Sequence, residues 1–111
     1  MDYKKLFASL SLLGLLASCA IQSASTKGLD KYQQAVAQYE AKKYYAAAQL
    51  FEEVLPQLRG KSNEASAHFY RAYCNFYEKQ YVQSANRFKY FRKTFPLDPR
   101  LEEALYMQAQ S

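Results

Sequence analysis

Between residues 29 and 111 the apolar positions follow the spacing of one buried helix face, i, i+3, i+4 and i+7. Four runs keep this spacing, with a small serine in the last: Tyr32, Ala35, Val36 and Tyr39; Tyr44, Ala47, Ala48 and Phe51; Phe69, Ala72, Tyr73 and Phe76; and Tyr81, Ser84, Ala85 and Phe88. The third and fourth runs match the first and second at a shift of 37 residues. The pattern therefore predicts two copies of a two-helix unit.

Capping and turn residues give the expected ends of these helices. In the first unit we expect Asp30 to cap a helix that ends near Lys42, a turn near Lys43, and a second helix that ends near Leu55, before Pro56. In the second unit we expect Ser62 or Asn63 to cap a helix that ends near Lys79, followed by a helix over Tyr81–Thr94. A third copy begins at Ala104, Tyr106 and Ala109, which predicts a fifth helix over Leu101–Gln110.

The sequence thus predicts an all-α fold, in which helical hairpins stack as a short α-solenoid of about five helices after a cleaved signal peptide. The expected repeat domain spans 29–111, with repeat 1 at 29–60, repeat 2 at 61–97 and the first helix of an incomplete repeat 3 at 98–111. Solenoids bury their core by stacking and usually need about three repeats. We expect Leu101, Leu105 and Tyr106 to cover the second hairpin, with nothing in the chain to cover them in turn. The expected result is a truncated chain of marginal stability, with an apolar terminal patch that favours dimerisation or requires a partner.

The N-terminus has the pattern of a bacterial lipoprotein signal. Lys4 and Lys5 precede the apolar run Leu6–Ala17, which is shorter than the ~20 residues of a membrane span. The run ends in Leu-Ala-Ser-Cys, which resembles a lipobox and predicts a signal peptide at 1–18, cleavage between Ser18 and Cys19, and acylation of Cys19. Two acyl chains, of palmitate type, suffice for stable anchoring. The alternative is an ordinary secretory signal with a chance cysteine.

Residues 19–28 are expected to form a flexible tether from the lipidated cysteine, because they are small and polar and lack a core-forming period. The residue that follows the lipidated cysteine is Ala20 and not an aspartate. By resemblance to bacterial lipoproteins, this permits transport to the outer membrane.

Composition argues against catalysis. The 111 residues include two cysteines and one histidine, too few for a histidine-based metal cage or a disulfide framework. No nucleophile with a partnered base and no phosphate-binding loop is present in the sequence, so we expect neither an enzyme, nor a metal site, nor a cofactor other than the covalent lipid on Cys19.

The net charge of +5 is mild, and a secreted lipoprotein meets no nucleic acid in the normal course. Arg87, Lys89, Arg92 and Lys93 flank Tyr90 and Phe91 in a stretch that could contact anionic lipid or nucleic acid. Helical spacing spreads these charges around the helix, which favours a solvated surface.

The two hairpins resemble the tetratricopeptide repeat family. Tyr44-x-x-Ala47-x-x-x-Phe51 and Tyr81-x-x-Ser84-x-x-x-Phe88 match its second-helix pattern, and Pro96 stands where its closing proline usually stands. Ser84 replaces the usual alanine, and Lys42 and Lys79 stand near the expected turn glycine.

Together with the lipobox, the chain also resembles the BamD family of outer-membrane β-barrel assembly lipoproteins. The segments that carry this resemblance are 44–53, 72–74, 88–96 and 102–107. The resemblance implies a lipid-anchored, periplasm-facing adaptor of the outer membrane, which binds unfolded barrel proteins and other subunits of the assembly machinery. The alternatives are another repeat-containing envelope lipoprotein, acting in cell-wall or division coordination, and a non-functional truncated copy.

A peptide-binding groove is expected on the first helices of the hairpins, beside their packing stripe. Tyr70, Cys74 and Tyr77 fall one residue beyond the stripe of the second unit. The equivalent positions elsewhere are Gln33, Ala37, Glu40 and Met107. Tyrosine and methionine are adaptable contact residues, so an aromatic-ended client segment could bind there. The alternatives are that Tyr70 and Tyr77 cover the junction between hairpins, and that Cys74 is a partly buried, unreactive thiol.

Overall fold

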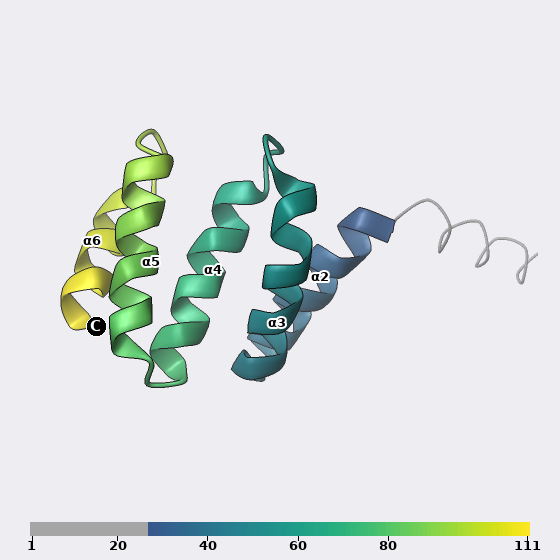
Figure 1. Ribbon diagram of the computed structural model, residues 1–111, viewed down its shortest axis with the longest axis horizontal. Coiled ribbons are helices and arrows are strands. Elements are labelled where there is room, and N and C mark those ends of the chain that lie inside the picture. Colours follow the sequence, from purple (N-terminus) through teal and green to yellow (C-terminus); the bar gives the residue numbers. More distant parts are fainter. Residues whose placement is uncertain (1–26) are drawn as a thin grey trace, which may run out of the picture.

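A computed structural model describes residues 27–111, which form five α-helices and no strand (Figure 1). The elements are α2 (Lys27–Glu40), α3 (Tyr44–Val54), the 3₁₀ helix η1 (Leu55–Leu58), α4 (Glu64–Tyr77), α5 (Tyr81–Thr94) and α6 (Leu101–Gln110). The prediction of an all-α fold with about five helices is confirmed. The signal peptide, the cleavage site at Ser18 and Cys19, and most of the tether lie outside the described residues.

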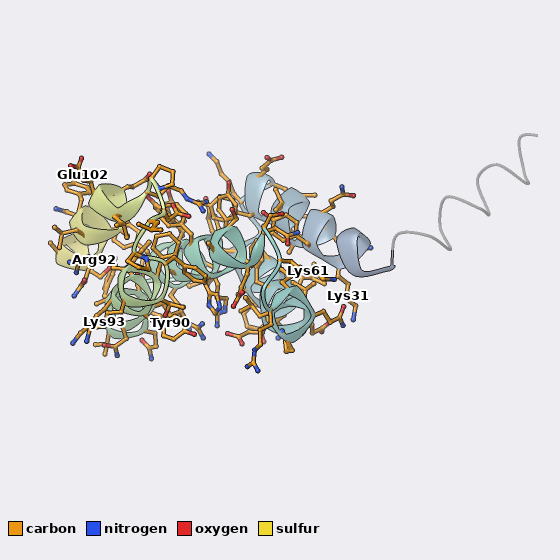
Figure 2. The ribbon with its side chains drawn as sticks, turned by 90° about the horizontal axis from the view of Figure 1, so that it is seen from above. Lys31, Lys61, Tyr90, Arg92, Lys93 and Glu102 are labelled. Atoms are coloured by element: carbon orange, nitrogen blue, oxygen red, sulfur yellow. The ribbon has the colours of Figure 1, made fainter. Side chains whose placement is uncertain are left out.

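The helices stack as consecutive hairpins. α2 packs on α3, α4 packs on α5, and α6 packs on α5, while α3 and α4 join the two hairpins (Figure 1). Seen from above, Tyr90 of α5 marks one edge of the stack and Glu102 of α6 marks the other (Figure 2). α4 contacts α3 of the first hairpin and α5 of its own hairpin, so more than one of its faces is in contact with other helices.

Two clusters of buried side chains fill the stack. The first consists of Ala35, Ala47, Ala48, Phe51, Val54, Leu58, Ala67 and Cys74. The second consists of Phe69, Ala72, Phe88, Phe91, Ala104 and Met107. The small side chains of Ala47 and Ser84, at matching repeat positions, are both fully buried and allow neighbouring helices to approach closely. Tyr70 packs against both clusters, which makes the core continuous.

The last helix is covered on one face only within the described residues. Ala104 and Met107 are buried against the second hairpin, and Leu101 packs against the same cluster. Leu105 and Tyr106 remain 51% and 61% exposed. Leu101 thus covers the second hairpin as expected, whereas Leu105 and Tyr106 form the exposed apolar patch on this helix.

The first helices of both hairpins end earlier than expected, at Glu40 and Tyr77. Lys42 and Lys79 adopt positive φ angles of 61° and 62°, which stops the helix. At the first turn, the amide of Lys42 donates to the carbonyl of Tyr39 at 2.9 Å. The amide of Lys43 donates to the carbonyl of Gln38 at the same distance, and the second turn repeats this arrangement. These paired hydrogen bonds form a Schellman motif, in which lysine occupies the usual glycine position.

The expected helix starts also need correction. α2 begins at Lys27, so Lys27 and Gly28 are helical rather than part of the tether, and Asp30 lies within the helix instead of capping it. Neither Ser62 nor Asn63 caps α4: Asn63 occupies the N-cap position but makes no side-chain capping hydrogen bond. Instead the Glu64 carboxylate accepts a hydrogen bond of 2.7 Å from the Gly60 amide, which closes the preceding turn.

Candidate functional site

Five tyrosines meet where the two hairpins join, and we call them the tyrosine seam: Tyr39, Tyr44, Tyr70, Tyr73 and Tyr77. The rings of Tyr44 and Tyr77 stack with centroids 4.4 Å apart, and those of Tyr39 and Tyr70 are 5.0 Å apart. The Tyr73 ring continues the row, 5.9 Å from Tyr77. The i, i+3, i+7 spacing of Tyr70, Tyr73 and Tyr77 places all three on one face of α4.

Two phenols of the seam, those of Tyr39 and Tyr73, are held in their neutral form. Burial raises the pKa of Tyr39, and the neighbouring Tyr77 raises it further. Burial also raises the pKa of Tyr73, whose hydroxyl donates a hydrogen bond to the Glu103 carboxylate of α6. A neutral phenol has an O–H that can donate to a carbonyl and a ring that packs against apolar groups.

Part of the seam is open to a ligand. Tyr77 is 46% exposed, and Tyr44 and Tyr73 are partly exposed at its sides. Glu40 and Gln33, both expected in the groove, are exposed on α2. The exposed part of the seam therefore offers aromatic area together with hydroxyl groups, a composition that suits contact with polypeptide.

Two of the expected groove residues are placed elsewhere. Cys74 is fully buried in the first cluster, because that face of α4 packs against the first hairpin. Met107 is 8% exposed in the second cluster, because α6 turns this position toward α5. Neither side chain can line a surface groove, so the prediction for both is wrong.

Tyr70 and Tyr77 do lie together, but as members of a packed junction. Tyr70 contacts rings of both hairpins, with Phe51 at 6.0 Å and Phe69 at 6.1 Å. Tyr77 contacts Tyr44 across the junction. The interpretation in which both side chains cover the junction therefore describes the structure, and only Tyr77 also offers substantial exposed area.

The helical spacing predicted that Tyr39, Tyr44 and Tyr73 lie on the packing stripe, but it did not predict that they take part in this surface. A signal for it was present, since all three are tyrosines at positions where a purely buried stripe would carry phenylalanine or leucine. Tyrosine is usual where one end of a side chain is buried and its hydroxyl is at the surface.

Other chemistry-bearing residues of the described part have structural surroundings. Burial raises the pKa of the Cys74 thiol to about 12, which disfavours the reactive thiolate. Arg87 pairs with Glu52, Arg92 donates to Gln108, and Phe91 is fully buried, so the basic stretch is dispersed around α5. Within residues 27–111 no group of three potential metal ligands gathers, and no helix is long and apolar enough to cross a membrane.

No protein-family model matches the chain, and no curated protein matches it in sequence. We therefore base the functional proposal on the stacked hairpins, the tyrosine seam and the N-terminal motif.

Proposed function

We propose that this chain is a non-catalytic, lipid-anchored adaptor that faces the periplasm and binds segments of unfolded β-barrel proteins during their insertion into the outer membrane. The observation that carries the proposal is the tyrosine seam, an aromatic surface at the junction of two hairpins. The lipobox-like residues before Cys19 support the membrane anchor. The resemblance to the BamD family supports the choice of clients and of assembly-machinery subunits as partners.

The chemistry of the seam suits an unfolded client. Tyrosine provides large contact area with few rotatable bonds, so ordering it on binding costs little entropy. The hydroxyl of the half-exposed Tyr77 can donate to an unpaired carbonyl of an extended strand, and its ring can pack against the side chains of that strand. An extended strand with aromatic residues satisfies both kinds of contact.

Client binding can be tested with a fluorescent peptide taken from the C-terminus of an outer-membrane barrel protein. Tyr77→Ala removes the most exposed ring of the seam, and we expect about fivefold weaker binding, equivalent to ~1 kcal/mol. Fluorescence anisotropy measures the affinity, and circular dichroism checks that the helices remain.

Tyr106→Ala is the matched control, because Tyr106 is exposed on α6 and outside the seam. An equal loss with Tyr106→Ala, or unchanged affinity with Tyr77→Ala, would reject the seam as the binding surface.

Anchorage and partners need separate tests. Cys19→Ser should abolish incorporation of radiolabelled palmitate and move the protein out of the outer-membrane fraction.

In detergent-solubilised envelopes, the wild-type chain should co-purify with barrel-assembly subunits. Co-purification with cell-wall or division proteins alone would instead favour the other class of envelope lipoprotein.

A further inference from the structure

A polar cleft follows a different face of α4 from the tyrosine seam, between α3–η1 on one wall and α4–α5 on the other. Three cavities of about 470, 190 and 370 Å³ follow one another along it. Glu52 lines the first two, while His68 and Tyr90 line the last two, so the cavities form one path. At about 100° per residue, Arg71 and Glu78 lie roughly a third of a turn away from Tyr70 and Tyr77.

Hydrogen bonds hold the walls of the polar cleft in place. One carboxylate oxygen of Glu52 accepts from Arg71 Nε at 2.9 Å and from Arg87 Nη2 at 2.6 Å, which joins α3, α4 and α5. Arg71 Nη1 also donates to Asn75 Oδ1 at 2.8 Å, and Asn75 donates to Gln80. The single negative charge of Glu52 is thus shared between two arginines, and these hydrogen bonds set the shape of the cleft before any ligand arrives.

The largest of these three cavities is lined by three glutamates and one arginine, on a chain that is basic overall. Glu53 and Glu78 stand on its opposite walls, one from each hairpin, and both are exposed. Among the described residues Glu78 has no ion pair, and Glu53 has one at 3.4 Å with Lys31 in which both side chains are about half exposed. Such exposed pairs are weak. A lysine or arginine side chain of a ligand could therefore bind between the two carboxylates.

The far end of the polar cleft is aromatic. The ring of Tyr90 lies 5.1 Å from that of His68 and is 51% exposed, on the edge of the stack seen in Figure 2. Burial lowers the pKa of His68, so this ring is neutral near pH 7. Gln83 and Asn86 lie beside it and carry both donors and acceptors that match main-chain amides. This end suits an apolar or aromatic side chain and its backbone.

We propose that the polar cleft is a second polypeptide-binding site, which takes an extended segment with a basic side chain between Glu53 and Glu78 and an aromatic side chain against Tyr90. α4 has 14 residues and spans about 21 Å at ~1.5 Å per residue. An extended chain advances ~3.3 Å per residue, so about six residues fit along it. This site goes beyond the proposed function, because it lies on another face of α4 than the tyrosine seam. It also selects a basic residue, whether or not the ligand is a barrel protein.

The probe is a fluorescein-labelled octapeptide of glycine, serine and threonine with one lysine and one phenylalanine, separated by three residues. The matched probe carries glutamate in place of lysine. We expect the lysine probe to bind the intact chain at least tenfold more tightly than the glutamate probe, with weaker binding at high salt. Glu78→Gln and Tyr90→Ala should each weaken binding of the lysine probe about fivefold.

Neighbouring residues give sharp controls. Tyr77→Ala alters the tyrosine seam, whereas Glu78→Gln alters the polar cleft. Glu102→Gln removes another exposed carboxylate, on α6. Tyr77→Ala and Glu102→Gln should leave binding of the lysine probe unchanged. The proposal is overturned if the lysine probe does not bind at millimolar concentration, if both probes bind equally, or if Glu78→Gln has no effect in a chain with native circular dichroism. Failure here leaves the barrel-peptide result with Tyr77→Ala unaffected, so the two proposals can be separated.

Discussion

At the scale of single residues, two lysines occupy a backbone conformation that usually belongs to glycine. Lys42 and Lys79 have φ angles of 61° and 62°, at matching positions of the two hairpins. A side chain in this left-handed region costs ~1 kcal/mol relative to glycine. Both turns make the same pair of helix-ending hydrogen bonds, which stabilise the conformation although lysine does not favour it.

We expect Lys79→Gly to stabilise the protein by about 0.5–1 kcal/mol, because it relieves this strain. Urea denaturation monitored by circular dichroism measures the change. Lys89→Gly is the control: Lys89 is exposed and lies inside α5, where glycine costs ~1 kcal/mol, so this substitution should destabilise the protein. A loss of stability with Lys79→Gly would show that the lysine side chain makes a favourable interaction in the turn.

Asp98 holds Arg100 in place in the connection between α5 and α6. Hydrogen bonds from the Arg100 guanidinium and, to a lesser extent, the Arg100 amide hold the pKa of Asp98 below its ordinary value. Arg100 also donates to Ser66 at 3.0 Å and lies over the Phe69 ring, 4.8 Å from its centroid. The pair therefore fixes the α5–α6 connection against α4.

A depressed carboxyl pKa stabilises the fold above the ordinary value and loses this effect as pH falls through the folded value. We therefore expect Asp98→Asn to be less stable than wild type at pH 7, with the difference shrinking below about pH 4. Urea denaturation across pH 2–7 measures both chains. A constant difference would mean that Asp98 contributes through packing rather than through its charge.

At the scale of elements, hydrophobic spacing predicted the helices well because every helix buries at least one stripe of side chains. The start and end of α5 and α6 agree with the prediction. The helix ends that were wrong depend on local backbone geometry that residue type does not reveal: the positive φ at Lys42 and Lys79, and the hydrogen bond from the Gly60 amide to Glu64. Capping residues alone could not show these.

The candidate site was harder to predict for a related reason. A helical wheel of α4, read for one buried face, leaves the opposite face open. In the structure α4 packs against the first hairpin as well as against α5, and it buries Cys74 on one side and Phe69 on another. Spacing correctly grouped Tyr70 with Tyr77, since both are on one face. Which face was already covered depends on how the hairpins stack, and that is not a local property of the sequence.

The link between the hairpins gives a prediction at this scale. Glu52→Gln removes the negative charge that pairs with Arg71, whose side chain is 14% exposed, and with Arg87. We expect a loss of about 1 kcal/mol that grows smaller at high salt, because these pairs are partly exposed. Hydrogen exchange should show faster opening at the α3–α4 contact. Glu53→Gln, whose only described ion pair is exposed, is the control and should change little.

At the scale of the whole molecule, the continuous core predicts cooperative opening. The Cys74 thiol is fully buried, and its pKa of about 12 makes it a poor nucleophile in the folded state. We expect its reaction with a thiol reagent to be slow and to accelerate in parallel with urea unfolding measured by circular dichroism. Labelling that precedes loss of helicity would mean that the first hairpin opens separately.

Tyr70 has one more consequence for the integrity of the fold. Its ring contributes to both halves of the interior, so neither half is complete without the other. A protease that nicks the exposed backbone at Gly60 should therefore yield two pieces that remain associated and elute together on gel filtration. The fold therefore does not depend on an unbroken chain at this turn. A split reporter divided there is expected to reassemble, and a circular permutant opened there is expected to fold.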